Sequence, residues 1–327
     1  MESAGTTVTR GEARKKRSAT SHALGDNLFL ALTAACAAVI NGVLLTLVIL
    51  LWSSSSSTFS TFGLGFLWGP VWSPSTNVFG AAPFVYGTLV TSALALLIGV
   101  PLSLGIAVFL TELAPAWLSS PLSFLVELLA AVPSVVYGLW GIFVLVPFMA
   151  STVNPGIESV LGTTPIFSSH SFGASVGQGY LTAGVILAIM IVPTISALSR
   201  DALSAVPQSQ REAALSLGAT RWEATRVSVL SYARVGIFGA IILGLGRAMG
   251  ETIAVTMTIG NSNAINNSLL SPGQTIASLI ANEFNESAGL HKSALLEIAL
   301  VLLLMSLVVN LLARFVLWRF TRPSGGG

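Results

Sequence analysis

The chain has 327 residues, of which 53% are hydrophobic and only 9% are charged, and its formal net charge is +2. An ordinary soluble domain carries roughly 25% charged residues, so this chain has too little charge to cover a surface in water, and most of it is expected to face lipid. The single cysteine, Cys36, excludes an internal disulfide framework, and His22, His170 and His291 have no metal-ligand spacing.

Six stretches are apolar and long enough to cross a bilayer, which takes about 20 helical residues. They lie at about 28–52, 84–110, 122–149, 180–199, 235–259 and 294–317. The sequence therefore predicts an all-α integral membrane protein with six transmembrane helices.

The basic residues predict the orientation of these helices. Five of the 15 lie in residues 1–27, five from Arg200 to Arg234 and three from Arg314 to Arg322, whereas 53–83 contains none. By the positive-inside rule both termini are cytoplasmic, and an even number of spans agrees with this. The alternative is a cleaved signal peptide, but the apolar run of residues 28–52 exceeds the 7–15 residues of such a peptide's core.

The predicted organisation follows from these spans. Residues 1–27 form a cytoplasmic basic tail, 28–83 the first helix with an external Ser/Gly-rich excursion, 84–318 the transmembrane core and 319–327 a cytoplasmic C-terminal tail. In the external excursion the serine run at 53–57 is expected to be irregular. Its aromatic residues Phe66, Trp68 and Trp72 are expected at the lipid headgroup level or on a partner surface.

Proline and glycine residues inside the spans predict kinks and close packing. Pro101, Pro133, Pro147 and Pro193 fall within predicted helices, which membrane proteins tolerate where neighbours satisfy the freed backbone groups. Small residues on the fifth span allow neighbouring helices to approach closely; they are Gly236, Gly239, Gly244 and Gly246.

The cytoplasmic loop at 200–232 has the signals of two short helices. Pro207 and Gly218 suit the start and the C′ position of the first helix, and Thr220 with Glu223 forms a capping box for the second. The first helix carries a small apolar patch beside an acidic residue. Its members are Glu212, Ala213, Ala214 and Leu217.

The run Glu212-Ala213-Ala214, with Gly218 four residues later, resembles the EAA loop of ABC importer permeases. This resemblance implies a type I ABC importer (MetI-like) permease fold in which Glu212, Ala213, Ala214, Leu217 and Gly218 dock onto a separate ATPase. The family's motif usually continues to a Leu-Pro pair, whereas this chain has Leu230-Ser231. The chain also lacks a phosphate-binding Gly-x-x-x-x-Gly-Lys loop, so ATP hydrolysis is expected on another polypeptide.

Two charged residues lie deep in the fifth predicted span. Arg247 and Glu251 each cost roughly 2.5–3.5 kcal/mol at a helix centre, so they are expected to face the bundle interior or a wet cavity. Their i,i+4 spacing places them on one face, where they form either a structural ion pair or part of an anion path. In the anion path Arg247 binds a tetrahedral oxyanion, while Glu251 keeps Arg247 oriented and accepts a hydrogen bond from a protonated oxygen of phosphate. Glu127 is a further candidate for the path, whereas Glu297 is expected to be structural.

The strings Leu128–Pro147 and Gly244–Val255 resemble the permeases of phosphate-specific ABC importers, more closely the C-type subunit than its A-type partner. This resemblance implies transport of inorganic phosphate by alternating access in a bacterial cell membrane. The implied partners are an A-type permease subunit, two ATP-binding subunits that hold ATP and Mg, and an extracytoplasmic phosphate-binding protein. No cofactor, metal or nucleic acid is expected on this chain.

Three other functions stay open. A permease for sulfate, molybdate or phosphonate would share the EAA loop but not the two strings. A passive anion channel would suit Arg247 but would have no use for that loop. An intramembrane enzyme would need paired catalytic groups, such as His with Glu or two Asp, within the spans, and these are absent from the sequence.

Overall fold

The computed structural model describes residues 9–167 and 176–321, with side chains for 26–167 and 176–319. His170, Arg322 and the side chains of the basic residues at 10–17 therefore lie outside the described part. Within that part all regular structure is helical apart from two isolated bridges, Ser73–Val78 and Gly260–Gly273. The predicted all-α class is confirmed. The chain divides into two compact units, residues 1–54 and 55–327.

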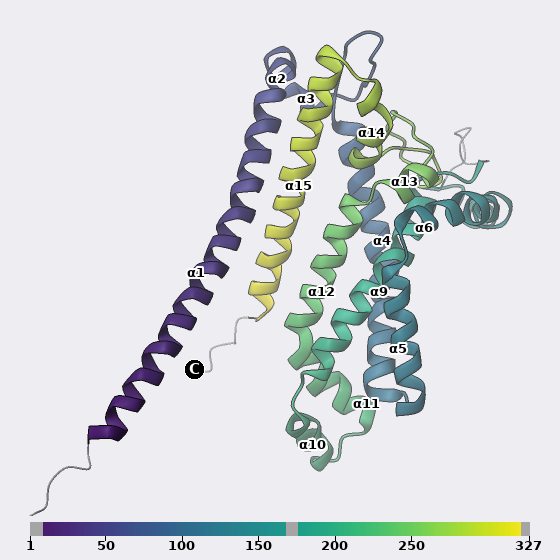
Figure 1. Cartoon of the computed structure of the whole chain (residues 1–327). Coiled ribbons are helices and arrows are strands. Elements are labelled where there is room, and N and C mark those ends of the chain that lie inside the picture. The colour runs from purple at the N-terminus through teal and green to yellow at the C-terminus, as the bar shows by residue number, and fades with distance from the viewer. Residues whose placement is uncertain (1–8, 168–175, 322–327) are drawn as a thin grey trace, which may run out of the picture. The chain divides into compact units, whose positions relative to one another are not determined.

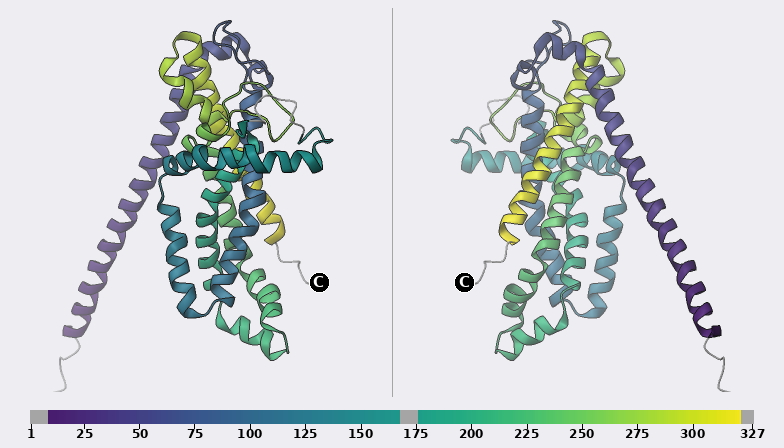
Figure 2. Two further views of the ribbon diagram at one scale, coloured as in Figure 1. Left: turned by 90° about the vertical axis from the view of Figure 1, so that its right-hand side faces the viewer. Right: turned by 90° about the vertical axis from the view of Figure 1, so that its left-hand side faces the viewer.

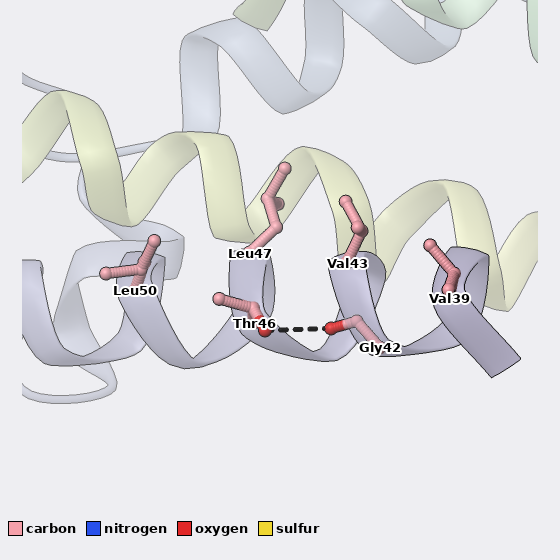
Figure 3. Close-up of a pocket in the computed structure, with 6 residues that line it drawn as sticks. All are labelled: Val39, Gly42, Val43, Thr46, Leu47 and Leu50. Carbon is pink, nitrogen blue, oxygen red and sulfur yellow. Dashed lines mark hydrogen bonds between the residues drawn. The ribbon is translucent and has the colours of Figure 1, made fainter.

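The first unit is the single helix α1, Thr9–Ser54. Its part from Asp26 to Ser54 is long and apolar enough to cross a membrane. One face carries a shallow groove in which a glycine lies among larger side chains (Figure 3), and the residues that line it are Val39, Gly42, Val43, Thr46, Leu47 and Leu50. The Thr46 hydroxyl donates to the Gly42 carbonyl at 2.8 Å, so this polar group is satisfied within the helix.

The second unit contains the remaining helices (Figure 1). In chain order they are α2 (Ser56–Phe62), α3 (Gly65–Trp68), α4 (Ala82–Val108) with its π-helical end η1 (Phe109–Leu113), α5 (Ala116–Ala131), α6 (Ser134–Trp140), η2 (Gly141–Leu145), α7 (Val146–Phe148), η3 (Met149–Val153), α8 (Asn154–Leu161), α9 (Tyr180–Ser204), α10 (Gln208–Ser216), α11 (Arg221–Ala224), η5 (Thr225–Val229), α12 (Leu230–Gly250), α13 (Ile253–Thr258), α14 (Ile276–Glu283), η6 (Phe284–Glu286) and α15 (Gly289–Thr321).

Six helical segments of the described residues are long and apolar enough to span a membrane, which agrees with the predicted number. Four predicted spans lie within single segments and are confirmed. Those segments are Asp26–Ser54, Ala82–Leu113, Tyr180–Ser204 and Gly289–Arg319.

The predicted span at 122–149 is wrong in its limits, because the chain breaks in its middle. Val132 is extended, with ψ 128°, as the residue before a proline prefers, so α5 ends and α6 begins after Pro133. Figure 2 shows α5 running alongside α9 while the segment from α6 to α8 runs across it. Pro101 and Pro193, in contrast, lie inside continuous helices.

Helix α9 is the centre of this unit and packs against both α4 and α12. Its residues Ile186, Leu187 and Ile191 are almost completely buried. Glycines bring α12 close to α9, since a Cβ on Gly244 would lie 2.5 Å from Ile195 and one on Gly236 would lie 2.5 Å from Ala202. The predicted close approach is therefore confirmed at these two positions.

The other two glycines of this group, Gly239 and Gly246, face open space. They contribute no close contact within the described part of the chain.

Different helices lie at the two ends of the second unit. The α10–α11 hairpin lies at one end, and α14 lies with α2 and α3 at the other (Figure 1).

The serine run at 53–57 is helical on both sides of Ser55 and not irregular as predicted, because α1 continues to Ser54 and α2 begins at Ser56. The backbone N–H of Thr58 in α2 donates to the Ser293 hydroxyl of α15 at 3.3 Å, which helps to order this segment.

The aromatic residues of the external excursion divide into two groups. Phe66 and Trp72 are buried in a core with Phe79 and Phe84, so their predicted place at the surface is wrong. The Trp72 indole N–H also donates to a Glu283 carboxylate oxygen at 2.8 Å. Trp68 is 82% exposed, as expected of a residue at the headgroup level or on a partner surface.

Candidate functional site

The α10–α11 hairpin has the caps that its sequence predicts. Helix α10 begins after Pro207 and ends at Ser216; Leu217 is its C-cap, and Gly218 follows with φ +88°. The Gly218 N–H donates to the Leu215 carbonyl and the Ala219 N–H to the Ala214 carbonyl, the two bonds of a Schellman motif. The resulting turn is sharp, and it fixes the direction in which the second helix leaves.

A capping box starts that second helix, α11. The Glu223 N–H donates to the Thr220 hydroxyl at 3.3 Å, and the Thr220 N–H donates to a Glu223 carboxylate oxygen at 2.8 Å. From Arg221 the chain continues as helix through η5 and α12 to Gly250. Ser231, which stands where the EAA motif usually has proline, lies within this continuous helix.

The predicted docking residues are on the outside of the hairpin. Glu212, Ala213, Leu217 and Gly218 are exposed and Ala214 is half-buried. Leu217 is 90% exposed, and α10 buries none of its residues. An exposed apolar patch on a short helix with no buried residue is typical of a surface that a partner covers.

The charged residues of the fifth span do not share one helix face. Helix α12 ends at Gly250, and Glu251 is extended with ψ 127° before α13 begins at Ile253. The prediction that both residues lie on one face of a continuous span at 235–259 is wrong, because the helix ends between them. Among the described residues no ion pair joins Arg247 to Glu251.

Arg247 lies in the last turn of α12 with its side chain exposed. The helix C-terminus carries a partial negative charge that favours a cation there. A Cβ on Gly246 or Gly250 would meet no packed neighbour within 4 Å, so the described chain also leaves these positions at the end of α12 open. On α6, the Tyr137 hydroxyl donates to the Leu129 carbonyl of α5 at 2.9 Å.

The two other acidic residues singled out in the spans have different surroundings. Glu127 accepts a 2.6 Å bond from Arg200, which joins α5 to α9, and its side chain is 54% exposed. Glu297 is only 7% exposed on α15, and its Oε2 has no partner within the described chain. Neither forms a contact with Arg247 or Glu251 in this part of the molecule.

One polar cluster was not anticipated from the sequence. Arg211, directly before Glu212, binds both carboxylate oxygens of Glu112 at 2.8 and 3.3 Å. The signal for it was present, since Glu112 is an acidic residue directly after an apolar span and Arg211 a basic one in the facing loop. The pairing across 99 residues, however, depends on the tertiary structure.

The geometry defines a helical membrane protein with a capped helical hairpin and an exposed arginine at a helix break. Residues 99–322 match the family model described as "Binding-protein-dependent transport system inner membrane component". The match covers more than half of the chain, so the chain belongs to this family of membrane permeases, and it is a multi-pass membrane protein.

Curated relatives narrow the similarity further. The chain is 49% identical to the "Phosphate transport system permease protein PstC" of Pasteurella multocida, over 83% of this chain and 85% of the relative. It is 44% identical to the protein of the same name from Mesorhizobium japonicum, over 95% of this chain and 96% of the relative. The C-type resemblance predicted from the two strings is confirmed.

Solved structures show the same fold at low sequence identity. The methionine ABC transporter MetNI, in an inward-facing form, matches with a TM-score of 0.52 at 17% identity, over 73% of this chain and 97% of the other. A bacterial ABC transporter that imports alginate matches with a TM-score of 0.54 at 17% identity, over 73% and 79%. The predicted type I (MetI-like) permease fold is confirmed.

Proposed function

We propose that this chain is the permease subunit of an ATP-driven importer and moves inorganic phosphate into the cell by alternating access. The observation that carries the proposal is Arg247, an accessible guanidinium at the break between α12 and α13 with no carboxylate partner in the described chain. A planar guanidinium can bind two oxygens of a tetrahedral oxyanion at once. The identity to proteins named as phosphate transport permeases supports phosphate as that anion.

The exposed α10–α11 hairpin supports the proposal that a separate subunit hydrolyses ATP. Its exposed Leu217 and Glu212 suit the socket of an ATPase, and the sequence has no phosphate-binding loop of its own. We infer a complex with an A-type permease subunit, two ATP-binding subunits that hold ATP and Mg, and an extracytoplasmic phosphate-binding protein. The permease chain itself is non-catalytic.

We further propose a bacterial plasma-membrane location with both termini in the cytoplasm. This orientation places the hairpin on the ATPase side, and its basic residues support it through the positive-inside rule. The α14 end of the second unit then faces outward (Figure 1).

The substrate path would include Arg247, Glu251 and Glu127, with unequal roles. Arg247 is free to meet the anion, and Glu251 sits just beyond the helix end. Glu127 is partly neutralised by Arg200, which makes it the weakest member of this group. We expect it to position α5 against α9 more than to contact the anion.

The experiment is ATP-dependent uptake of radiolabelled phosphate by vesicles that contain the complete complex. Arg247→Ala should lower uptake by about tenfold or more, because it removes a charged hydrogen-bond partner of the anion. A tenfold loss corresponds to about 1.4 kcal/mol. Arg314→Ala is the control, since Arg314 is an exposed arginine with no ion pair in the described chain.

Unchanged uptake in Arg247→Ala would refute the assigned path. Phosphate flux without ATP would favour the channel, and preferential uptake of sulfate or molybdate would favour the permease for another oxyanion.

A further inference from the structure

The α10 helix has little contact by which to transmit a force to the membrane helices. None of its residues is buried, and a cavity of about 160 Å³ lies beside it, lined by Gln208 and Leu215 of α10 together with Glu112 and Val229. Motion of a docked ATPase must therefore reach the bundle mainly through polar bonds and the covalent chain.

The side chain of Arg211 makes most of those polar bonds. Its Nη2 and Nε donate to the two carboxylate oxygens of Glu112 at 2.8 and 3.3 Å, and Glu112 lies in η1 at the end of α4. Its Nη1 donates to the Val206 carbonyl at 2.6 Å and its Nη2 to the Leu203 carbonyl at 3.0 Å, at the end of α9. One guanidinium thus ties the docking helix to the ends of both central helices.

This cluster is only partly exposed to water, although both Arg211 and Glu112 line the cavity beside α10. The side chains of Arg211 and Glu112 are 18% and 11% exposed, whereas Glu127 in the other arginine pair is 54% exposed. Buried charge-assisted bonds are stronger than exposed ones, and an arginine fork holds a carboxylate in a fixed geometry. A second link, from the Ser228 hydroxyl to the Gln210 carbonyl at 2.9 Å, joins α10 only to the adjacent η5.

We propose that Arg211 and Glu112 are positioning residues that couple ATPase motion to α4 and α9. The proposal rests on the proposed function, because it assigns the docking helix to an ATPase. When the ATPase displaces α10, the shared guanidinium carries the displacement to α4 through the Glu112 carboxylate and to α9 through the Leu203 and Val206 carbonyls. Without it α10 can move while the central helices stay in place.

The test is the number of phosphate ions imported per ATP hydrolysed by the complete complex in vesicles. Arg211→Gln and Glu112→Gln should each lower this ratio at least threefold while ATP hydrolysis and co-purification of the ATPase persist. Arg211→Lys should give an intermediate ratio, since an ammonium has three donors and cannot replace all four hydrogen bonds of the planar guanidinium. The double Gln variant should be no worse than the worse single variant, because both remove the same link. Arg226→Gln, an exposed arginine of the same loop without an ion pair in the described chain, should keep the wild-type ratio.

A merely structural role would reduce the amount of complex but leave the ratio of the intact complexes unchanged, and that result would overturn the proposal. Should Arg211→Gln fail to assemble, Glu112→Gln decides, because Glu112 lies outside the docking hairpin. Failure of both to assemble would also overturn it, since the pair would then serve assembly. Failure of the proposed function is distinct, because the wild-type complex itself would then show no ATP-dependent uptake.

Discussion

The described chain does not offset the full free-energy cost of placing Arg247 in a membrane. An arginine costs roughly 2.5–3.5 kcal/mol at a helix centre on insertion scales and less toward a helix end, where Arg247 lies, and the C-terminal end of α12 returns about 0.3–1 kcal/mol. No carboxylate in the described chain pairs with it to supply the difference. The remainder must come from water, a partner subunit or the transported anion, which is the situation expected of a residue in a polar path.

Glu251 offers a test of how the anion is chosen. It is half-buried directly after α12 and has no ion pair in the described chain, so its carboxylate can accept a hydrogen bond. Phosphate near neutral pH carries a proton to donate, and sulfate does not. Glu251→Gln should therefore narrow the preference for phosphate over sulfate by about tenfold, corresponding to about 1.4 kcal/mol.

Competition between labelled phosphate and unlabelled sulfate in vesicle uptake measures this preference. Glu286→Gln is the control, since Glu286 is an exposed carboxylate outside the helical spans. An unchanged preference together with an unchanged rate in Glu251→Gln would remove this carboxylate from the path.

Among the elements, the α10–α11 hairpin is where local sequence decides most. Its helix start, its glycine turn and its capping box each involve residues within five positions of one another, so short-range chemistry predicts them. The helix breaks at Pro133 and Glu251 were harder to predict from the sequence. Prolines at 101 and 193 sit inside helices, while Pro133 starts a new one, and only the packing of α6 against α13 distinguishes these outcomes.

The capping box predicts a graded effect on docking. Thr220→Ala removes the oxygen that accepts the Glu223 N–H, and loss of such a cap costs about 0.5–2 kcal/mol. Fraying of α11 should loosen the turn at Gly218 and lower the amount of ATPase that co-purifies by several-fold. Thr220→Ser keeps the oxygen and should behave as wild type. Equal retention of the ATPase by both variants would show that the cap does not support docking.

At the scale of the whole molecule, the predicted features are the ones that repeat or lie close in sequence. Hydropathy and basic residues predicted the number of spans, and two short strings predicted the family. The link between Arg211 and Glu112, the partner of Glu127 and the burial of Trp72 all depend on residues brought together from 73 to 211 positions apart. No local pattern specifies such pairs, because many side chains of suitable charge compete for each partner.

The segment before α14 provides the final prediction, because it closes tightly on the central helices. A Cβ on Gly87 of α4 would overlap the Gln274 carbonyl oxygen, and one on Gly273 would overlap the Tyr180 ring. A backbone oxygen held between helices cannot move aside as a side-chain end can, so Gly87→Ala should cost about 1–3 kcal/mol through overpacking. The expected result is a lower midpoint of thermal unfolding of the purified complex. Gly105→Ala is the matched control on the same helix, since nothing lies within 4 Å of that position and alanine is about 0.5–1 kcal/mol better than glycine in a helix interior. The control should keep or slightly raise the midpoint, and an equal midpoint for both variants would show that this segment does not pack as closely as the structure indicates.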